Sequence, residues 1–130
     1  MSKNTPLPAA PEIWPEAQPY WDAAGEGRLM VMRCLSCEQH YVHPRPFCPH
    51  CGSDRTEWRE AVGTGTIYTF TITARAPVFH APAMVQLDEG PTMMTAIVDC
   101  DPETLTIGQP VTVTFHPTDG GPPLPVFKPA

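Results

Sequence analysis

Two closely spaced cysteine pairs constrain the fold of this chain more than any other feature. Cys34 and Cys37 form one C-x-x-C pair, Cys48 and Cys51 form a second, and ten residues separate the pairs. Two such pairs can close a tetrahedral four-sulfur site around one metal ion. Because four protein ligands leave no position for water or substrate, we expect a structural site. The spacing therefore predicts a small metal-bound ribbon with these four cysteines as ligands.

The expected ion is one Zn²⁺, because zinc is redox-inert and common in ribbons, although a four-sulfur site also accepts iron. Three histidines, His40, His43 and His50, lie near the cysteine pairs. Each could in principle replace a cysteine, but the four-cysteine set is already complete. Cys100 is the fifth cysteine, and we expect it to be a small packing residue.

Cysteines that bind metal, in place of a disulfide framework, indicate a reducing compartment. The first residues lead into a segment rich in Pro, Ala and Glu, unlike the apolar core of a signal peptide. No stretch reaches the ~18 apolar residues of a membrane span. We therefore expect a cytoplasmic protein with no membrane partner.

The charge of the chain is unevenly placed. The 130 residues carry a formal net charge of −6. From Ala61 onward the cations are Arg75 and Lys128, against six carboxylates, at Asp88, Glu89, Asp99, Asp101, Glu103 and Asp119. An acidic second half is a poor binder of phosphate backbones, so we expect no nucleic-acid partner. Five arginines lie around the cysteine pairs instead, at Arg28, Arg33, Arg45, Arg55 and Arg59. They could meet the phosphates of a ligand, but a solvated surface is the favoured interpretation.

The order of local patterns predicts three segments. Residues 1–18 form a proline-rich tail, residues 19–61 a short helix followed by the ribbon, and residues 62–130 a β-barrel that ends in a proline-rich arm. The helix spans residues 19–27, since Pro19 suits a first turn and the glycines suit a stop. We expect Tyr20, Trp21 and Ala24 on its buried side.

Strand patterns fill most of the remaining chain. Strands are expected in the ribbon at 28–33, 41–42 and 56–59, and in the barrel at 66–73, 83–87, 92–98, 111–115 and 125–127. In the first barrel strand the threonines are expected on one face, with Tyr68, Phe70 and Ile72 on the other. Five short strands separated by turn residues fit an OB-fold, and an SH3-like barrel or an open meander competes with it.

No catalytic set emerges from the sequence, and we predict no catalytic residue. Cys100 stands between two aspartates, which raise a thiol pKa. His80 and His116 have no nucleophile beside them in the sequence pattern. Asp88 and Glu89 precede a Gly-Pro pair, where a solvated turn is expected in place of acid–base work.

One loop offers an aromatic side chain for recognition. Residues 75–82 are stiffened by Pro77 and Pro82, with Phe79 at the expected tip. Phe79 either docks a partner or ligand, or folds back over the barrel mouth. The strand aromatics Tyr68, Phe70 and Phe115 could stack nucleic-acid bases, but core or interface positions are favoured.

From about Pro19 to the C-terminus, the layout resembles the DUF35 family. The matching motifs are Pro19-Tyr20-Trp21 with Glu26-Gly27-Arg28, Arg33-Cys34-x-x-Cys37, Pro44-Arg45-x-x-Cys48-Pro49-x-Cys51, Trp58, Gly63-x-Gly65-Thr66-Ile67-Tyr68-x-Phe70-Thr71, Leu87-Asp88-Glu89-Gly90, Ile107-Gly108-x-Pro110-Val111 and Leu124-Pro125-x-Phe127. The motifs are short, but their order and spacing are specific. One position departs from the family, since Glu38 follows the first cysteine pair where the family often has Gly.

The resemblance implies a mainly β protein with a short N-terminal helix, a rubredoxin-like zinc ribbon and a five-stranded OB-fold barrel. It also implies a non-catalytic accessory subunit of a thiolase-superfamily complex, whether acyltransferase, thiolase or aldolase, acting on acyl-CoA or related acyl substrates. Such a subunit assembles the complex as a hetero-oligomer, binds or channels substrate, and leaves the catalytic residues to its partner. The alternative is a free-standing OB-fold module that binds acyl-CoA or single-stranded nucleic acid.

Overall fold

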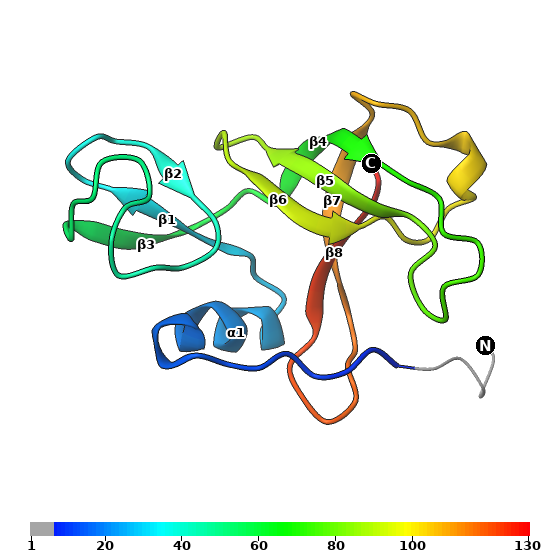
Figure 1. Ribbon diagram of the computed structural model, residues 1–130, viewed down its shortest axis with the longest axis horizontal. Helices are drawn as coiled ribbons and strands as arrows, with labels where there is room; N and C mark the ends of the chain where they lie inside the picture. The colour runs from blue at the N-terminus through cyan, green and yellow to red at the C-terminus, as the bar shows by residue number, and fades with distance from the viewer. Residues whose placement is uncertain (1–6) are drawn as a thin grey trace.

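Two antiparallel sheets lie side by side along the long axis of the molecule in the computed structural model, with one helix beneath them (Figure 1). The structure describes residues 7–130, so the first part of the predicted tail lies outside the described residues. The elements in chain order are η1 (Pro15–Ala17), α1 (Gln18–Gly25), β1 (Met30–Cys34), β2 (His40–Tyr41), β3 (Thr56–Glu60), β4 (Thr64–Phe70), β5 (Pro82–Leu87), β6 (Thr92–Ala96), η2 (Pro102–Thr104), β7 (Pro110–His116) and β8 (Leu124–Pro129).

The predicted helix is confirmed as α1, and a glycine in a left-handed conformation ends it. Gly27 has a φ of 79°, a left-handed conformation that is unstrained in glycine. The backbone N–H of Gly27 donates to Ala24 O at 3.0 Å, and this bond closes the last turn. Tyr20, Ala23 and Ala24 are buried, whereas Trp21 is only half-buried. Trp21 still packs against the core, so the expected buried side of the helix is confirmed.

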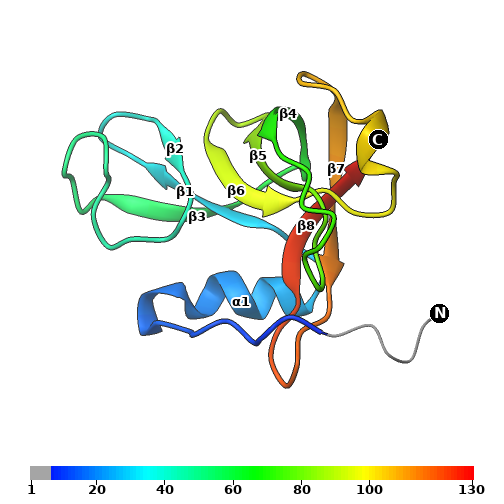
Figure 2. The same cartoon turned by 45° about the vertical axis from the view of Figure 1, so that its right-hand side comes forward.

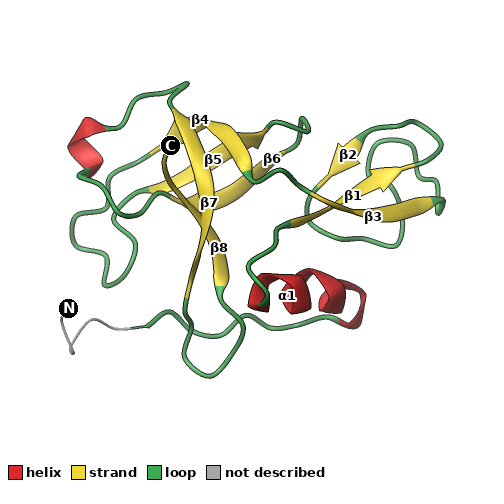
Figure 3. Ribbon diagram, turned by 180° about the vertical axis from the view of Figure 1, so that it is seen from behind, coloured by secondary structure: helices red, strands yellow, loops and turns green. Residues whose placement is uncertain are grey.

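The first sheet is the ribbon, in the order β2-β1-β3. β1 is its central strand, with Met32 opposite Tyr41 on one side and opposite Trp58 on the other. Seen from behind, α1 lies beneath the ribbon and beside β8 (Figure 3). None of the helices within residues 7–130 is long and apolar enough to cross a membrane.

The second sheet has five strands in the order β6-β5-β4-β7-β8. Its edges meet where Ile97 bridges Phe127 and the N–H of Val98 donates to Phe127 O at 2.7 Å. The hydroxyl of Thr95 also donates to Pro125 O at 3.1 Å. The sheet is therefore curled into a barrel. Its first strand, β4, lies between the second and the fourth, an order that excludes the open meander.

The first barrel strand differs from its prediction. β4 ends at Phe70, and its pairing with β5 shifts register between Ile67 and Thr69. Such an irregularity interrupts the strict alternation of faces. Ile67 is buried, whereas Tyr68 is 62% exposed and Ile72 lies outside the strand and is also exposed. The predicted common face of Tyr68, Phe70 and Ile72 is therefore not seen, because Phe70 packs against the core whereas Tyr68 and Ile72 are exposed.

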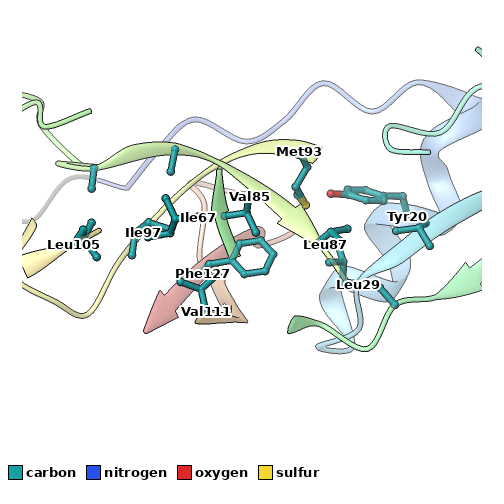
Figure 4. Close-up of a cluster of buried hydrophobic side chains, with 14 residues drawn as sticks. Tyr20, Leu29, Ile67, Val85, Leu87, Met93, Ile97, Leu105, Val111 and Phe127 are labelled. Carbon is teal, nitrogen blue, oxygen red and sulfur yellow. The ribbon is translucent and has the colours of Figure 1, made fainter. Parts of the chain in front are cut away.

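One hydrophobic core runs from the helix side of the molecule into the barrel (Figure 4). Tyr20 and Leu29 contribute from the N-terminal half, and Ile67, Val85 and Phe127 fill the barrel. The core therefore ties the ribbon to the barrel. Because Phe127 is fully buried, the last strand is part of the barrel wall and not a free arm.

The described part of the N-terminal tail is docked. Ala9 bridges Asp119, whose N–H donates to Pro8 O at 3.0 Å. Figure 2 shows this segment running from the β7–β8 hairpin along α1. Gly121 permits the approach, since a Cβ at this position would lie 2.5 Å from the Cβ of Ala10.

Candidate metal centre and neighbouring sites

The four predicted cysteines come together in the ribbon. Their sulfur atoms all lie within 4.8 Å of one another, with 3.6 Å between the sulfurs of Cys34 and Cys51 and 3.7 Å between those of Cys37 and Cys48. Four sulfurs held about 2.3 Å from one ion at tetrahedral angles lie about 3.8 Å apart. The cluster therefore fits a single structural metal ion.

The two cysteine pairs form matching backbone turns. In the first, the N–H of Cys34 donates to Gln39 O at 2.9 Å, and in the second the N–H of Cys48 donates to Ser53 O at 2.8 Å. The hydroxyls of Ser36 and Ser53 are 2.8 Å apart and join the two turns. The ribbon thus presents four sulfurs from two equivalent loops.

Backbone N–H groups point at two of the sulfurs, and at Cys34 they favour the charged form. The N–H of Cys37 lies 3.4 Å from the Cys34 sulfur, and it is the main cause that lowers the pKa of the Cys34 thiol to about 6. The N–H of His50 lies 3.3 Å from the Cys48 sulfur. Hydrogen bonds to a thiolate stabilise the form that binds metal.

The nearby histidines do not join the cluster. Within residues 7–130, the four cysteines are the only group of three or more His, Cys, Asp or Glu side chains whose ligand atoms lie close enough to share an ion. His40 pairs with Arg33 in the ribbon sheet, and the ring of His43 faces Tyr20, with 6.1 Å between ring centroids. A histidine in place of a cysteine is therefore not supported by the geometry.

Several of the ribbon arginines are balanced by carboxylates. Arg28 contacts Glu26 and also Glu60, the latter at 3.2 Å. Arg59 contacts Glu57. These exposed pairs favour the interpretation of a solvated surface over a phosphate-binding cluster.

An open pocket of about 540 Å³, lined by both polar and apolar side chains, lies where the ribbon meets the β5–β6 hairpin. Its wall includes Arg45 and His50 from the ribbon and Glu89 from the hairpin. Both signs of charge line it, so it does not present the positive field that a phosphate-rich ligand requires.

The side chains considered for catalysis are engaged elsewhere or unsuited to it. The ring nitrogens of His80 and His116 lie 3.1 Å from Ala76 O and 2.9 Å from Pro117 O, respectively. Burial, together with the charges of the neighbouring aspartates, raises the pKa of Cys100. A thiol with a raised pKa is a poor nucleophile.

Asp88 and Glu89 form the predicted turn, but their carboxylates are not free in solvent. The hydroxyl of Thr64 donates to Asp88, and the N–H of Val62 donates to Glu89 Oε2 at 2.8 Å. Glu89 Oε1 is buried without a hydrogen-bond partner in the described structure. The turn therefore holds the segment that links the ribbon to the barrel, a role that the sequence pattern did not indicate.

Phe79 folds back toward the barrel, as one of its two predicted alternatives has it, and it also lines a pocket beside α1. The side chain is half-buried and packs edge-on against His116, with 5.2 Å between ring centroids. The loop therefore folds back on the β7–β8 side of the barrel. Tyr68, in contrast, presents an aromatic ring to solvent.

Family models match both halves of the chain. The model described as the ChsH2 rubredoxin-like zinc ribbon domain matches residues 21–57, and the ChsH2 C-terminal OB-fold domain matches residues 58–116. The second match, together with the strand order, confirms the predicted OB-fold over the SH3-like alternative.

Similar proteins carry scaffold and enzyme-subunit names. A probable enoyl-CoA hydratase alpha subunit of Thermomonospora curvata is 37% identical over 116 residues, which are 85% of this chain and 36% of the relative. The chain thus spans about a third of the length of that relative. A DUF35 domain-containing scaffold protein of Methanocaldococcus jannaschii is 36% identical over 96 residues, covering 68% of this chain and 67% of the relative.

Solved structures agree with these matches. A chain of the Ltp2-ChsH2(DUF35) aldolase superposes with a TM-score of 0.78 at 35% identity, covering 92% of this chain and 98% of that chain. A DUF35 protein of Sulfolobus solfataricus, at 13% identity and a TM-score of 0.63, shares the fold. The resemblance seen in the sequence motifs is therefore confirmed, and this chain is a member of the DUF35 family.

Proposed function

We propose that this protein is a non-catalytic accessory subunit of a thiolase-superfamily enzyme that acts on acyl-CoA or a related acyl substrate. The observation that carries the proposal is the likeness to a chain of the Ltp2-ChsH2(DUF35) aldolase, which extends over 98% of that chain. A likeness over nearly the whole length indicates that the same unit serves in both proteins. The scaffold names of the archaeal relatives support an assembly role.

The chemistry of the described side chains is consistent with a non-catalytic subunit beside a catalytic partner. The sulfur cluster has four protein ligands and no open coordination position, which suits stability in preference to catalysis. We propose zinc as the ion, bound by Cys34, Cys37, Cys48 and Cys51. The bound ion would neutralise the thiolates and hold the two loops of the ribbon together.

The barrel is the proposed contact surface for the enzyme. Tyr68 on β4 and Met94 on β6 are large apolar side chains that are 62% and 74% exposed. Exposed aromatic and methionine side chains are enriched in protein interfaces. In this assembly the catalytic side chains come from the larger subunit.

The proposal is tested by affinity purification of the tagged full chain from its native cells. A thiolase-like enzyme should co-purify in a fixed ratio, and its activity on acyl-CoA substrates should fall when the accessory chain is omitted. Recovery of the chain as a monomer, with full enzyme activity in its absence, would contradict the proposal.

A further inference from the structure

An apolar pocket of about 280 Å³ opens between α1 and the seam of the barrel. The seam is the place where β6 faces β8, so the pocket lies where the barrel wall is least continuous. Three aromatic side chains, Tyr20, Trp21 and Phe79, line it together with Met93 and Met94. A pocket of this volume holds one compact molecule of one or two rings, or a short chain.

The lining of this pocket carries no Asp, Glu, Lys or Arg side chain. Its one basic ring is that of His43. Desolvation by the pocket wall, with the charge of Arg45, lowers the pKa of His43 and keeps the ring neutral at pH 7. Because no charge compensates for a buried ion, the pocket favours an uncharged ligand.

Tyr20 supplies a polar atom that nothing in the described structure uses. The residue is 3% exposed, and its hydroxyl points toward Met93 on the pocket wall (Figure 4). The hydrogen bonds found among residues 7–130 include none made by this hydroxyl, and its oxygen keeps some accessible surface, since Glu89 Oε1 is the fully buried side-chain oxygen found there without a partner. Burial raises the pKa of Tyr20, so the hydroxyl stays protonated and is available as a donor.

One further polar side chain of the pocket, Thr95, is already satisfied. The hydroxyl of Thr95 donates to Pro125 O, which also lines the pocket. The ring of Trp21 packs at 85° against Tyr20, with 4.9 Å between centroids, and so fixes the direction of the phenol. The pocket thus combines apolar walls with one oriented, unused O–H donor.

We propose that this pocket binds a compact, uncharged, apolar molecule through one carbonyl oxygen, which accepts a hydrogen bond from the hydroxyl of Tyr20. The site is formed by this chain alone and needs no partner subunit. Its test uses this chain alone, so the result is independent of the assembly role proposed above, although Met94 belongs both to the pocket and to the proposed contact surface.

The experiment is a fluorescence titration of the full chain, with its metal bound, using prodan as the probe. Prodan is an uncharged naphthalene that carries one ketone, and its emission shifts when the ketone accepts a hydrogen bond. The unaltered protein should bind prodan. Tyr20→Phe, which keeps the ring and removes the donor, should weaken binding by about tenfold and shift the bound emission to the blue.

Two controls make the result specific. Tyr68→Phe removes the hydroxyl of an exposed tyrosine that does not line the pocket, and it should leave both affinity and emission unchanged. Dimethylaminonaphthalene, which lacks the ketone, should bind the unaltered protein and Tyr20→Phe equally. Equal melting temperatures would show that Tyr20→Phe is folded.

Three results would overturn the proposal. They are no binding of prodan to the unaltered protein, equal affinity and emission in Tyr20→Phe, and an equal loss of affinity for the probe without the ketone. The second result would mean that the hydroxyl is satisfied by water alone.

Discussion

Glu38 and Gly52 occupy equivalent positions, each directly after the second cysteine of its pair, and both have a left-handed backbone. Their φ angles are 65° and 80°, and their N–H groups donate to Cys34 O and Cys48 O, each at 2.9 Å. Glycine adopts this conformation without strain, whereas a residue with a Cβ is strained by about 1–2 kcal/mol. The left-handed position of the first turn therefore carries a strained residue, Glu38, whereas that of the second turn carries an unstrained glycine.

Replacing Glu38 by Gly should stabilise the protein by about 1 kcal/mol, because the strain is removed. The ion pair of Glu38 with Arg33, at 3.5 Å, is exposed and should cost little to lose. Chemical denaturation of the metal-bound protein measures the change. The matched substitution Gly52→Ala has open space around its Cβ, so it tests backbone strain alone and should destabilise by a similar amount. A loss of stability in Glu38→Gly would contradict this account.

Loss of one ligand should unfold the ribbon. Its own hydrophobic cluster is small, and Cys34 and Cys48 make up half of its four buried members, so little else holds the two loops together. Cys48→Ser should release one metal equivalent per chain and abolish protection of the ribbon amides from hydrogen exchange. Cys100→Ser, outside the sulfur cluster, should keep the metal. Elemental analysis of the unaltered protein should report zinc, and a full equivalent of metal in Cys48→Ser would disprove the ligand assignment.

Metal affinity should depend more steeply on pH below about pH 6. The N–H of Cys37 lowers the pKa of Cys34 to about 6 in the metal-free protein, so this thiol is already deprotonated at pH 7. Below pH 6, the metal must displace one additional proton, and the slope of log affinity against pH should increase by about one. The stabilisation from the Cys34 thiolate is likewise present at high pH and is lost as the pH falls through about 6.

Competition with a chromophoric chelator across pH 5 to 8 measures this slope. Cys100→Ser should show the same change of slope, since Cys100 lies outside the sulfur cluster. A constant slope from pH 5 to 8 would mean that the pKa of Cys34 in the metal-free protein lies outside this range.

The sequence predicts the elements of this fold well because their signals are local. Each ribbon and barrel strand is present within a few residues of its expected position, and the cysteine spacing anticipates the sulfur cluster. The faces of β4 could not be predicted, because the register shift between Ile67 and Thr69 interrupts the alternation of faces and leaves no mark in the sequence pattern.

Other features could not be predicted because they depend on contacts between residues far apart in the sequence. The Asp88-Glu89-Gly90 turn was expected to be solvated, yet Glu89 reaches Val62, 27 residues away, to accept its N–H. The motif Pro19-Tyr20-Trp21 supplies Tyr20 and Trp21 to one wall of the apolar pocket. The pocket itself could not be predicted from the sequence, since its opposite wall comes from β6 and β8. Only the folded chain brings these segments together.

Glu89→Ala should loosen the link between the ribbon and the barrel. The substitution removes the acceptor of the Val62 N–H and should cost about 1 kcal/mol of stability. Limited proteolysis should then cut faster between residues 61 and 63. Glu103→Ala, an exposed carboxylate in η2, is the matched control and should change neither stability nor cleavage. Unchanged proteolysis of Glu89→Ala would show that the core alone holds the link.

Tyr68→Asp should weaken capture of the proposed enzyme partner. The ring is 62% exposed on the barrel wall, where a partner could bury it, and aromatic anchors of this kind contribute about 2 kcal/mol or more to binding. Titration of the purified enzyme against the immobilised chain should show at least about tenfold weaker binding.

Ile107→Asp places the same charge at an apolar side chain that is 70% exposed in the turn before β7, and it should bind normally. Because both side chains are exposed, neither substitution should unfold the barrel. Equal binding by the two variants would exclude Tyr68 as an anchor and shift the search to the other exposed apolar residues.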